Sequence, residues 1–213
     1  QFALTSCCPS WSVMAKNLFP ETIDKISNEL TPMVATARLI KQEHPDASVV
    51  FIGPCASKKL EASRRTVRSD VDFVITFEEL TGMFEAKGIL LDEIKAMDEM
   101  KDATSAGRGY GVAGGVANAI KDCIEKYYAG TPVNIQHAES LAECKKALLL
   151  AKAGKMNGCL IEGMACPGGC IAGAGTNIAI PVAARAVDKF KNEAEKKVPD
   201  ESVDQEMVEL EKE

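Results

Sequence analysis

The stretch GCLIEGMACPGGCIAGAG, residues 158–175, places two cysteines four positions apart in a glycine-rich segment that follows an apolar run. A short apolar run of this kind, before Cys166, is typical of a strand in a parallel sheet. The glycines at 168, 169, 173 and 175 leave backbone N–H groups free to approach a bulky anionic ligand. The stretch therefore predicts a strand that ends in a loop built around a large group.

The same order of strand and cysteine occurs twice more in the chain. FALTSCC, residues 2–8, is a β-like run that ends at the cysteine pair, and SVVFIGPC, residues 48–55, is apolar throughout, as a strand buried on both faces would be. Ligands of parallel sheets gather at the carboxyl ends of the strands. We therefore expect one parallel sheet to bring four cysteines to one edge, namely Cys8, Cys55, Cys166 and Cys170.

The intervening segments have helical spacing, which predicts an α/β fold with a mostly parallel β-sheet flanked by helices in βαβ units. Helices are expected over residues 9–19, 20–30 and 31–44, and strand-then-helix units over 71–88 and 133–155, with Gly154 after the last helix as its cap. We expect one domain over residues 1–197 and an acidic, solvated tail over residues 198–213.

A glycine-rich loop precedes a further helix, expected from Val112 onward. Gly107, Gly109 and Gly111 superficially resemble a nucleotide-binding loop. However, no strong strand precedes them and no Lys-Ser/Thr pair follows, so close backbone packing is the better interpretation.

Composition restricts the class of protein. A net charge of -6 and a pI near 5.2 argue against nucleic acid as a partner. No apolar run approaches the roughly 20 residues that span a bilayer, so no membrane partner is expected. The start of the chain does not resemble a secretory signal. Eight cysteines without such a signal indicate a cytoplasmic protein whose thiols bind metal or do redox chemistry.

Four thiolates are the ligand set of a 4Fe-4S cluster and also of a structural zinc site. Zinc sites usually use two close Cys-x-x-Cys pairs, whereas the spacing here is scattered. The pattern therefore favours iron and sulfur, with zinc as the alternative. The other three cysteines, at 123, 144 and 159, lie on apolar helix faces or a strand and are expected in the core.

The three segments TSCCPSW, GPCASKKLE and EGMACPGGCIAGAG resemble, in this order, the three signature segments of the iron-only (FeFe) hydrogenase active-site domain. The resemblance runs to about residue 190 and implies a two-lobed domain that catalyses 2H⁺ + 2e⁻ ⇌ H₂. Its cofactor in that family is the H-cluster, a 4Fe-4S cubane joined to a diiron unit with CO, cyanide and dithiolate ligands. By position, the implied cubane ligands are Cys8, Cys55, Cys166 and Cys170, with Cys170 as the bridge.

Four further roles follow from the resemblance alone. Cys7 matches the thiol that passes protons to the diiron unit, and Ser27 falls where the family has a serine on the proton path. Lys58 matches the lysine that hydrogen-bonds a cyanide, and Met164 matches a methionine packed near the diiron unit. The implied partners are protons, H₂ and an electron carrier such as ferredoxin or upstream iron-sulfur domains.

The chain departs from the family pattern in three places. Gly53 stands where many catalytic members have a methionine and Ala56 replaces a polar neighbour, which predicts a wider or wetter diiron pocket and a low-activity or H₂-sensing member. GAG at 173–175 replaces three glycines. A family segment before TSCCP, part of the second lobe, is missing, so we expect a fragment that is inactive alone and incomplete in its cofactor.

One alternative keeps the iron-sulfur chemistry without catalysis. A hydrogenase-like protein with only a 4Fe-4S cluster would serve cluster assembly or electron transfer. Cys7, Lys58 and Met164 discriminate between the two functions, because none of them has a purpose around a cubane alone.

Overall fold

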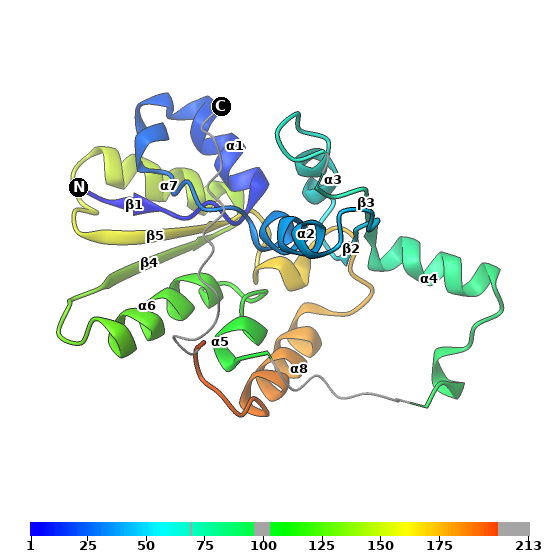
Figure 1. Cartoon of the computed structure of the whole chain (residues 1–213). Coiled ribbons are helices and arrows are strands. Elements are labelled where there is room, and N and C mark those ends of the chain that lie inside the picture. The colour runs from blue at the N-terminus through cyan, green and yellow to red at the C-terminus, as the bar shows by residue number, and fades with distance from the viewer. Residues whose placement is uncertain (69, 96–102, 200–213) are drawn as a thin grey trace.

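The computed structural model describes residues 1–68, 70–95 and 103–199, and these form an α/β molecule with two small parallel sheets (Figure 1). The first sheet has the strand order β1 (Ala3–Leu4), β5 (Cys159–Met164), β4 (Asn134–Glu139). The second pairs β2 (Val50–Gly53) with β3 (Phe73–Thr76). The fold class is confirmed, but the single sheet that was expected to carry all the cysteines is divided in two.

The three-stranded sheet is covered on both faces. Helices α1 (Pro9–Leu18) and α7 (Leu141–Lys152) lie on one face and α6 (Gly115–Tyr127) on the other (Figure 1). The α1 and α7 side has an apolar core that includes Leu4, Trp11, Leu148 and Ile161, each fully buried. Burial of these side chains fixes the carboxyl ends of β1 and β5 beside each other.

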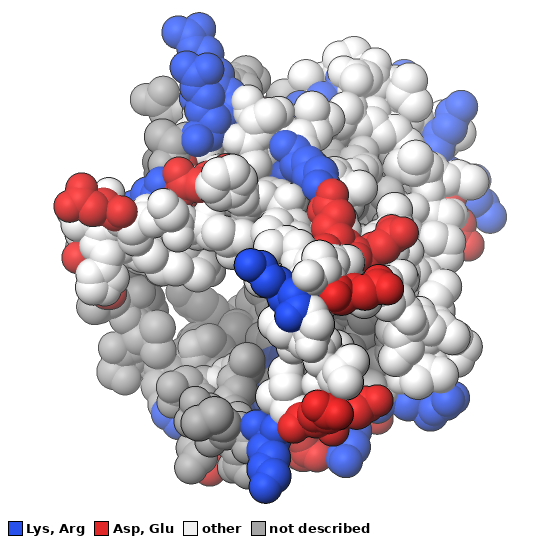
Figure 2. All heavy atoms as spheres, turned by 90° about the vertical axis from the view of Figure 1, so that its right-hand side faces the viewer, with Lys and Arg blue, Asp and Glu red and all other residues white. Residues whose placement is uncertain are grey.

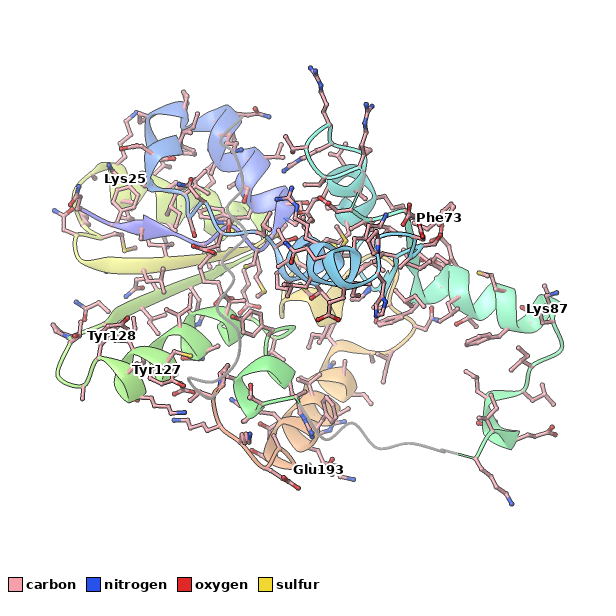
Figure 3. The ribbon with its side chains drawn as sticks, viewed as in Figure 1. Lys25, Phe73, Lys87, Tyr127, Tyr128 and Glu193 are labelled. Carbon is pink, nitrogen blue, oxygen red and sulfur yellow. The ribbon has the colours of Figure 1, made fainter. Side chains whose placement is uncertain are left out.

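The two-stranded sheet is covered on one face only. Helix α2 (Pro32–Glu43) packs there through Met33 and Val34, against a cluster that includes Phe51. On the opposite face Val50 and Ile52 are 44% and 45% exposed. The prediction that this strand is buried on both faces is therefore wrong, because adjacent strand residues point to opposite faces and the described residues cover one of them. Phe73 of β3, labelled in Figure 3, is 64% exposed.

The second sheet is flanked by α3 (Ser57–Ala62) and α4 (Phe77–Ala86). Four short elements and a last helix complete the described chain, with these bounds: η1 (Pro20–Lys25), η2 (Leu91–Glu93), α5 (Ser105–Arg108), η3 (Cys170–Ala172) and α8 (Ile180–Asn192).

Two element boundaries differ from those expected. The helix predicted over 20–30 is only a 3₁₀ turn, because Ile26 forms a β-bridge with Leu4 and cannot be helical. The helix expected from Val112 begins at Gly115. Gly154, with φ +76°, follows α7 and confirms the predicted end of that helix.

The predicted tail begins inside the folded body. Val198 is 6% exposed and packs with Ala106 and Ala119, and the Lys126 ammonium donates to the Pro199 carbonyl at 3.0 Å. The adjacent Tyr127, labelled in Figure 3, donates its hydroxyl to the same carbonyl. Residues 200–213 of the predicted tail lie outside the described part of the chain.

The charged side chains are dispersed on the face that carries α4. Figure 2 shows acidic and basic residues side by side in mixed groups on that face, with uncharged areas between the groups and no continuous basic patch among the residues drawn in colour. In the described ranges, no helix has the length and hydropathy needed to cross a membrane.

Candidate metal centre

The first cysteine loop joins β1 to α1. Cys8 is the N-cap residue of α1, and Pro9 occupies the first helical position, where a missing N–H costs nothing. The Trp11 indole donates to the Thr5 carbonyl at 3.0 Å, and its ring covers Gly163 so closely that a Cβ there would lie 2.2 Å from the ring. Trp11 and Gly163 together hold the Cys8 loop against β5.

The second cysteine loop joins β2 to α3 and contains Cys55. The hydroxyl of Ser57, two residues later, is hydrogen-bonded to the hydroxyl of Ser10 in α1. This contact links the loop of Cys55 to the loop of Cys8 across the two sheets.

The third loop follows β5 and contains Cys166 and Cys170. It is bound to the second loop, since the Gly175 N–H donates to the Pro54 carbonyl at 2.9 Å. A Cβ on Gly173 would lie 2.3 Å from the same carbonyl oxygen. Space for a ligand was the reason expected for glycine here, and the structure supplies another: close packing of two cysteine loops.

A fourth segment, the glycine-rich loop of residues 107–115, also lies against the third loop. The Ala113 N–H donates to the Gly168 carbonyl at 3.1 Å, and the Ile171 N–H donates to the Gly111 carbonyl at 3.2 Å. Gly169 has φ +90°, and a Cβ there would meet the Ala113 nitrogen at 2.4 Å. Close backbone packing was predicted for the glycine-rich loop and is confirmed, but the sequence did not indicate its position beside the cysteines.

The thiols of the three loops are close enough to influence one another electrostatically. Burial raises the pKa of Cys166, and the neighbouring Cys55 and Cys8 add to that rise. Burial, followed by Cys8, Cys55 and Cys7, raises the pKa of Cys170 to about 12, while the Lys58 ammonium acts in the opposite direction. The candidate ligands and Lys58 therefore share one region of the molecule, at the meeting point of the two sheets.

Cys7 and Met164 lie beside this region. Burial, and secondarily the carboxylate of Glu162, raises the pKa of Cys7 to about 11. Met164 is the last residue of β5 and is 3% exposed, and strand alternation places it on the same face of the sheet as Glu162.

Ser27 stands apart from the thiols. It is exposed, its N–H donates to the Leu4 carbonyl at 2.8 Å, and its hydroxyl accepts from the Glu29 N–H at 3.2 Å. It lines a cavity of about 100 Å³ whose wall also includes Ser12 and Glu61.

The donor set has the chemistry of an iron-sulfur cluster site. Among the described residues, no three His, Cys, Asp or Glu side chains are arranged to hold one metal ion. A cubane needs thiolates spread around a larger body, and four cysteines from three loops supply that chemistry. The eight cysteines are all free thiols.

Glu162 is a residue of the site to which the sequence assigned no partner. It is 1% exposed, and its two carboxylate oxygens accept from the N–H groups of Gly114 at 2.9 Å and Ala117 at 2.7 Å. Glu162 in fact serves as the cap of α6, whose own N-cap residue is a glycine.

The prediction that the remaining cysteines lie in the core is confirmed for Cys144, which is fully buried. Cys123 and Cys159 are only partly buried, packed against apolar clusters.

The space opened at Gly53 is already filled. A Cβ at this position would lie 2.8 Å from the ring of Phe51, which points to the same side of β2. The expectation of a wider pocket therefore needs correction, because the Phe51 ring lies where a side chain at residue 53 would begin.

Comparisons with known proteins give relatives of two kinds. The periplasmic [Fe] hydrogenase large subunit of Nitratidesulfovibrio vulgaris is 28% identical over 87% of this chain and 53% of its own length. The cytosolic iron-sulfur assembly component 3 of Bos taurus is 26% identical over 81% of this chain and 46% of its own length. The chain thus spans about half the length of these curated relatives.

A solved [FeFe]-hydrogenase, from work on oxygen inactivation of the H cluster, has the same fold. It superposes with a TM-score of 0.73 and 22% identity, covering 92% of this chain and 66% of that one. The model of the family described as "Iron only hydrogenase large subunit, C-terminal domain" matches residues 1–174. The chain therefore belongs to the family of C-terminal domains of iron-only hydrogenase large subunits.

Proposed function

We propose that this chain is the cofactor-binding part of an iron-only hydrogenase, whose complete protein catalyses 2H⁺ + 2e⁻ ⇌ H₂ at an H-cluster. The supporting observation is that four cysteines from three loops, together with Cys7 and Lys58, meet where the two sheets join. When bound, such a cofactor supplies the redox chemistry, and the protein supplies geometry and tuning interactions.

The proposed ligands of the cubane are Cys8, Cys55, Cys166 and Cys170, with Cys170 as the bridging sulfur. Because burial raises the pKa values of Cys166 and Cys170, cofactor binding must displace their protons. The hydrogen bonds between the loops hold the ligands in place before the cofactor arrives.

Cys7 is the proposed proton donor, and its raised pKa of about 11 keeps the thiol protonated near neutral pH. Lys58 supplies an ammonium donor for an anionic ligand. Met164 packs beside the diiron position, and Ser27 lies at the solvent end of the proton path. The expected partners are protons, H₂ and an electron carrier such as ferredoxin or upstream iron-sulfur domains. We place the protein in the cytoplasm, where a reducing environment keeps all its thiols free.

One relative supports a second candidate function. The assembly component of Bos taurus aligns with 81% of this chain at 26% identity. The alternative is therefore a non-catalytic protein that carries only a 4Fe-4S cluster. The joint presence of Cys7, Lys58 and Met164 favours catalysis, since a cubane alone has no use for them. A low-activity or H₂-sensing member is the proposed subclass, because Gly53 and Ala56 depart from the residues of many catalytic members. A wider pocket is not the reason, since the Phe51 ring fills the space at Gly53.

Two cysteine variants of the complete parent protein test the proposal. Cys170→Ser should abolish attachment of the diiron unit, seen as loss of the CO and cyanide infrared bands. Cys7→Ser should keep these bands and lower H₂ turnover by roughly 100-fold or more, the usual range for a lost proton donor.

Cys159→Ser is the matched control, because Cys159 is a partly buried thiol at the far end of β5. It should keep both the infrared bands and the turnover. A Cys7→Ser protein that turns over at the wild-type rate would remove the proton role from Cys7.

A further inference from the structure

Lys58 is paired with a carboxylate that has no assigned role. Its ammonium donates to Glu61 Oε2 at 2.7 Å, one turn later in α3. Both residues are buried, Lys58 being 7% and Glu61 4% exposed. A buried pair of this kind is uncommon, since Lys and Glu are almost never fully buried unless paired.

The next lysine provides a direct comparison. Lys59 also contacts a carboxylate, with its ammonium 2.7 Å and 2.8 Å from the two oxygens of Glu79, but these side chains are 43% and 49% exposed. Water screens and solvates the exposed pair, so it contributes little to stability. The two adjacent pairs therefore have the same chemistry and differ in burial.

The surroundings of Lys58 oppose its positive charge. An ammonium that leaves water loses its solvation, which no apolar neighbour replaces. In addition, Lys58 lies in the first turn of α3, where the partial positive charge of the helix terminus disfavours a cation. Glu61 supplies the nearby negative charge that offsets both effects.

The Lys58 ammonium contacts Glu61 and also acts electrostatically on the thiols. The charge of Lys58 acts on the thiols of Cys7 and Cys170, whereas Glu61 lines the cavity beside Ser27. An ammonium has three N–H donors, and Glu61 takes one of them. The other two remain available for an anionic ligand at the cysteine site.

We propose that Glu61 is a positioning residue, whose buried ion pair with Lys58 offsets the cost of burying the ammonium and holds it beside the ligand site. This inference rests on the proposed function for the identity of the ligand, an anionic group of the bound cofactor. The pairing itself concerns only residues of this chain, so it is testable without the cofactor.

The first experiment uses the chain of 213 residues without cofactor, labelled with ¹⁵N-lysine. The hydrogen-bonded Lys58 ammonium should give a slowly exchanging ¹⁵Nζ signal, assigned by its loss in Lys58→Met. Glu61→Gln should remove that signal and lower the folding equilibrium constant roughly 100-fold or more, because it leaves a buried charge unpaired. Glu79→Gln, the matched control, should keep the signal and change the constant less than about fivefold.

If Glu61→Gln does not fold, the double variant Lys58→Met/Glu61→Gln tests whether Glu61 is needed because of its pairing with Lys58. Recovery of folding after both charges are removed supports the pairing. A double variant that fails equally shows that Glu61 is needed for something other than Lys58 and overturns the proposal. Equal effects of Glu61→Gln and Glu79→Gln on the Lys58 signal also overturn it.

The second experiment uses the parent protein matured with its diiron unit. Glu61→Gln should shift the cyanide infrared bands and Glu79→Gln should not, and Glu61→Asp, which keeps the charge, should shift them less than Glu61→Gln. Unshifted bands in Glu61→Gln would overturn the positioning role. A parent without any such bands would instead remove the proposed function, while the ¹⁵N result would still decide the pairing.

Discussion

Glu162 shows how one buried carboxylate connects two parts of the site. It belongs to β5, two residues before Met164, yet its hydrogen bonds reach the first turn of α6. Burial raises the pKa of Glu162, although the N–H donors of Ala117 and Gly114 oppose that rise. The Glu162 carboxylate thus binds N–H groups that an N-cap side chain next to the helix would otherwise bind, and it loses its own solvation in doing so.

The raised pKa predicts a specific pH dependence. Between the pKa of the unfolded chain and the higher pKa of the folded protein, the folded state binds more protons, so this group's contribution to stability falls as pH rises. Below both values the contribution is fully present. Residue 162 does not ionise in Glu162→Gln. The free energy of unfolding of the wild type, relative to that of this variant, should therefore fall as the pH rises above about 4.

Urea unfolding midpoints of the two proteins across the acid range measure this difference. A difference that stays constant with pH would show that Glu162 titrates at the same pH in both states.

Single residues differ in how far the sequence could assign them. Roles for Cys7, Lys58 and Met164 could be proposed from the sequence, because these residues lie at fixed positions beside the cysteines in three signature segments. The partners of Glu162 lie 48 and 45 residues away in the chain, and no local pattern identifies them. Glu61 ends the segment GPCASKKLE, but its burial depends on how α3 packs and is not visible in the residue order.

At the scale of elements, strands and helices were predicted better than their exposure. The strand-then-cysteine pattern located β1, β2 and β5 correctly. The run SVVFIG suggested burial on both faces, whereas β2 has one covered face. Apolar residues in a strand indicate that the strand prefers to be buried. Which element covers each face depends on the tertiary packing of the chain.

The contact between the second and third cysteine loops depends on the absence of a side chain at Gly173. Its φ is -60°, which any residue adopts, so only space restricts the position. Gly173→Ala would place a Cβ 2.3 Å from the Pro54 carbonyl oxygen. We expect a loss of about 1–3 kcal/mol in the free energy of unfolding and lower iron incorporation, because the loops of Cys55 and Cys170 must separate.

Gly82→Ala is the control, since nothing lies within 4 Å of a Cβ at this position inside α4. Helix propensity predicts a gain of about 1 kcal/mol there. Urea unfolding together with iron analysis measures both effects, and a Gly173→Ala protein with wild-type stability and iron content would show that the two loops can separate freely.

At the scale of the whole molecule, the α/β class with parallel pairing was predictable from alternating strands and helices. The division into two sheets was not, because strand order depends on long-range contacts such as the pairing of β1 with β5. The site lies where the two sheets meet, and its four cysteines come from both. Hydrogen bonds between loops, such as that of Ser10 with Ser57, take the place of a common sheet edge.

We propose that these loops hold an H-cluster rather than a cubane alone. The most direct measurement is the infrared spectrum, with iron and sulfide analysis, of the parent protein matured anaerobically with its diiron unit. We expect CO and cyanide stretching bands that disappear in Cys170→Ser. Iron and sulfide in the parent without those bands would contradict it and identify a protein that carries only a 4Fe-4S cluster.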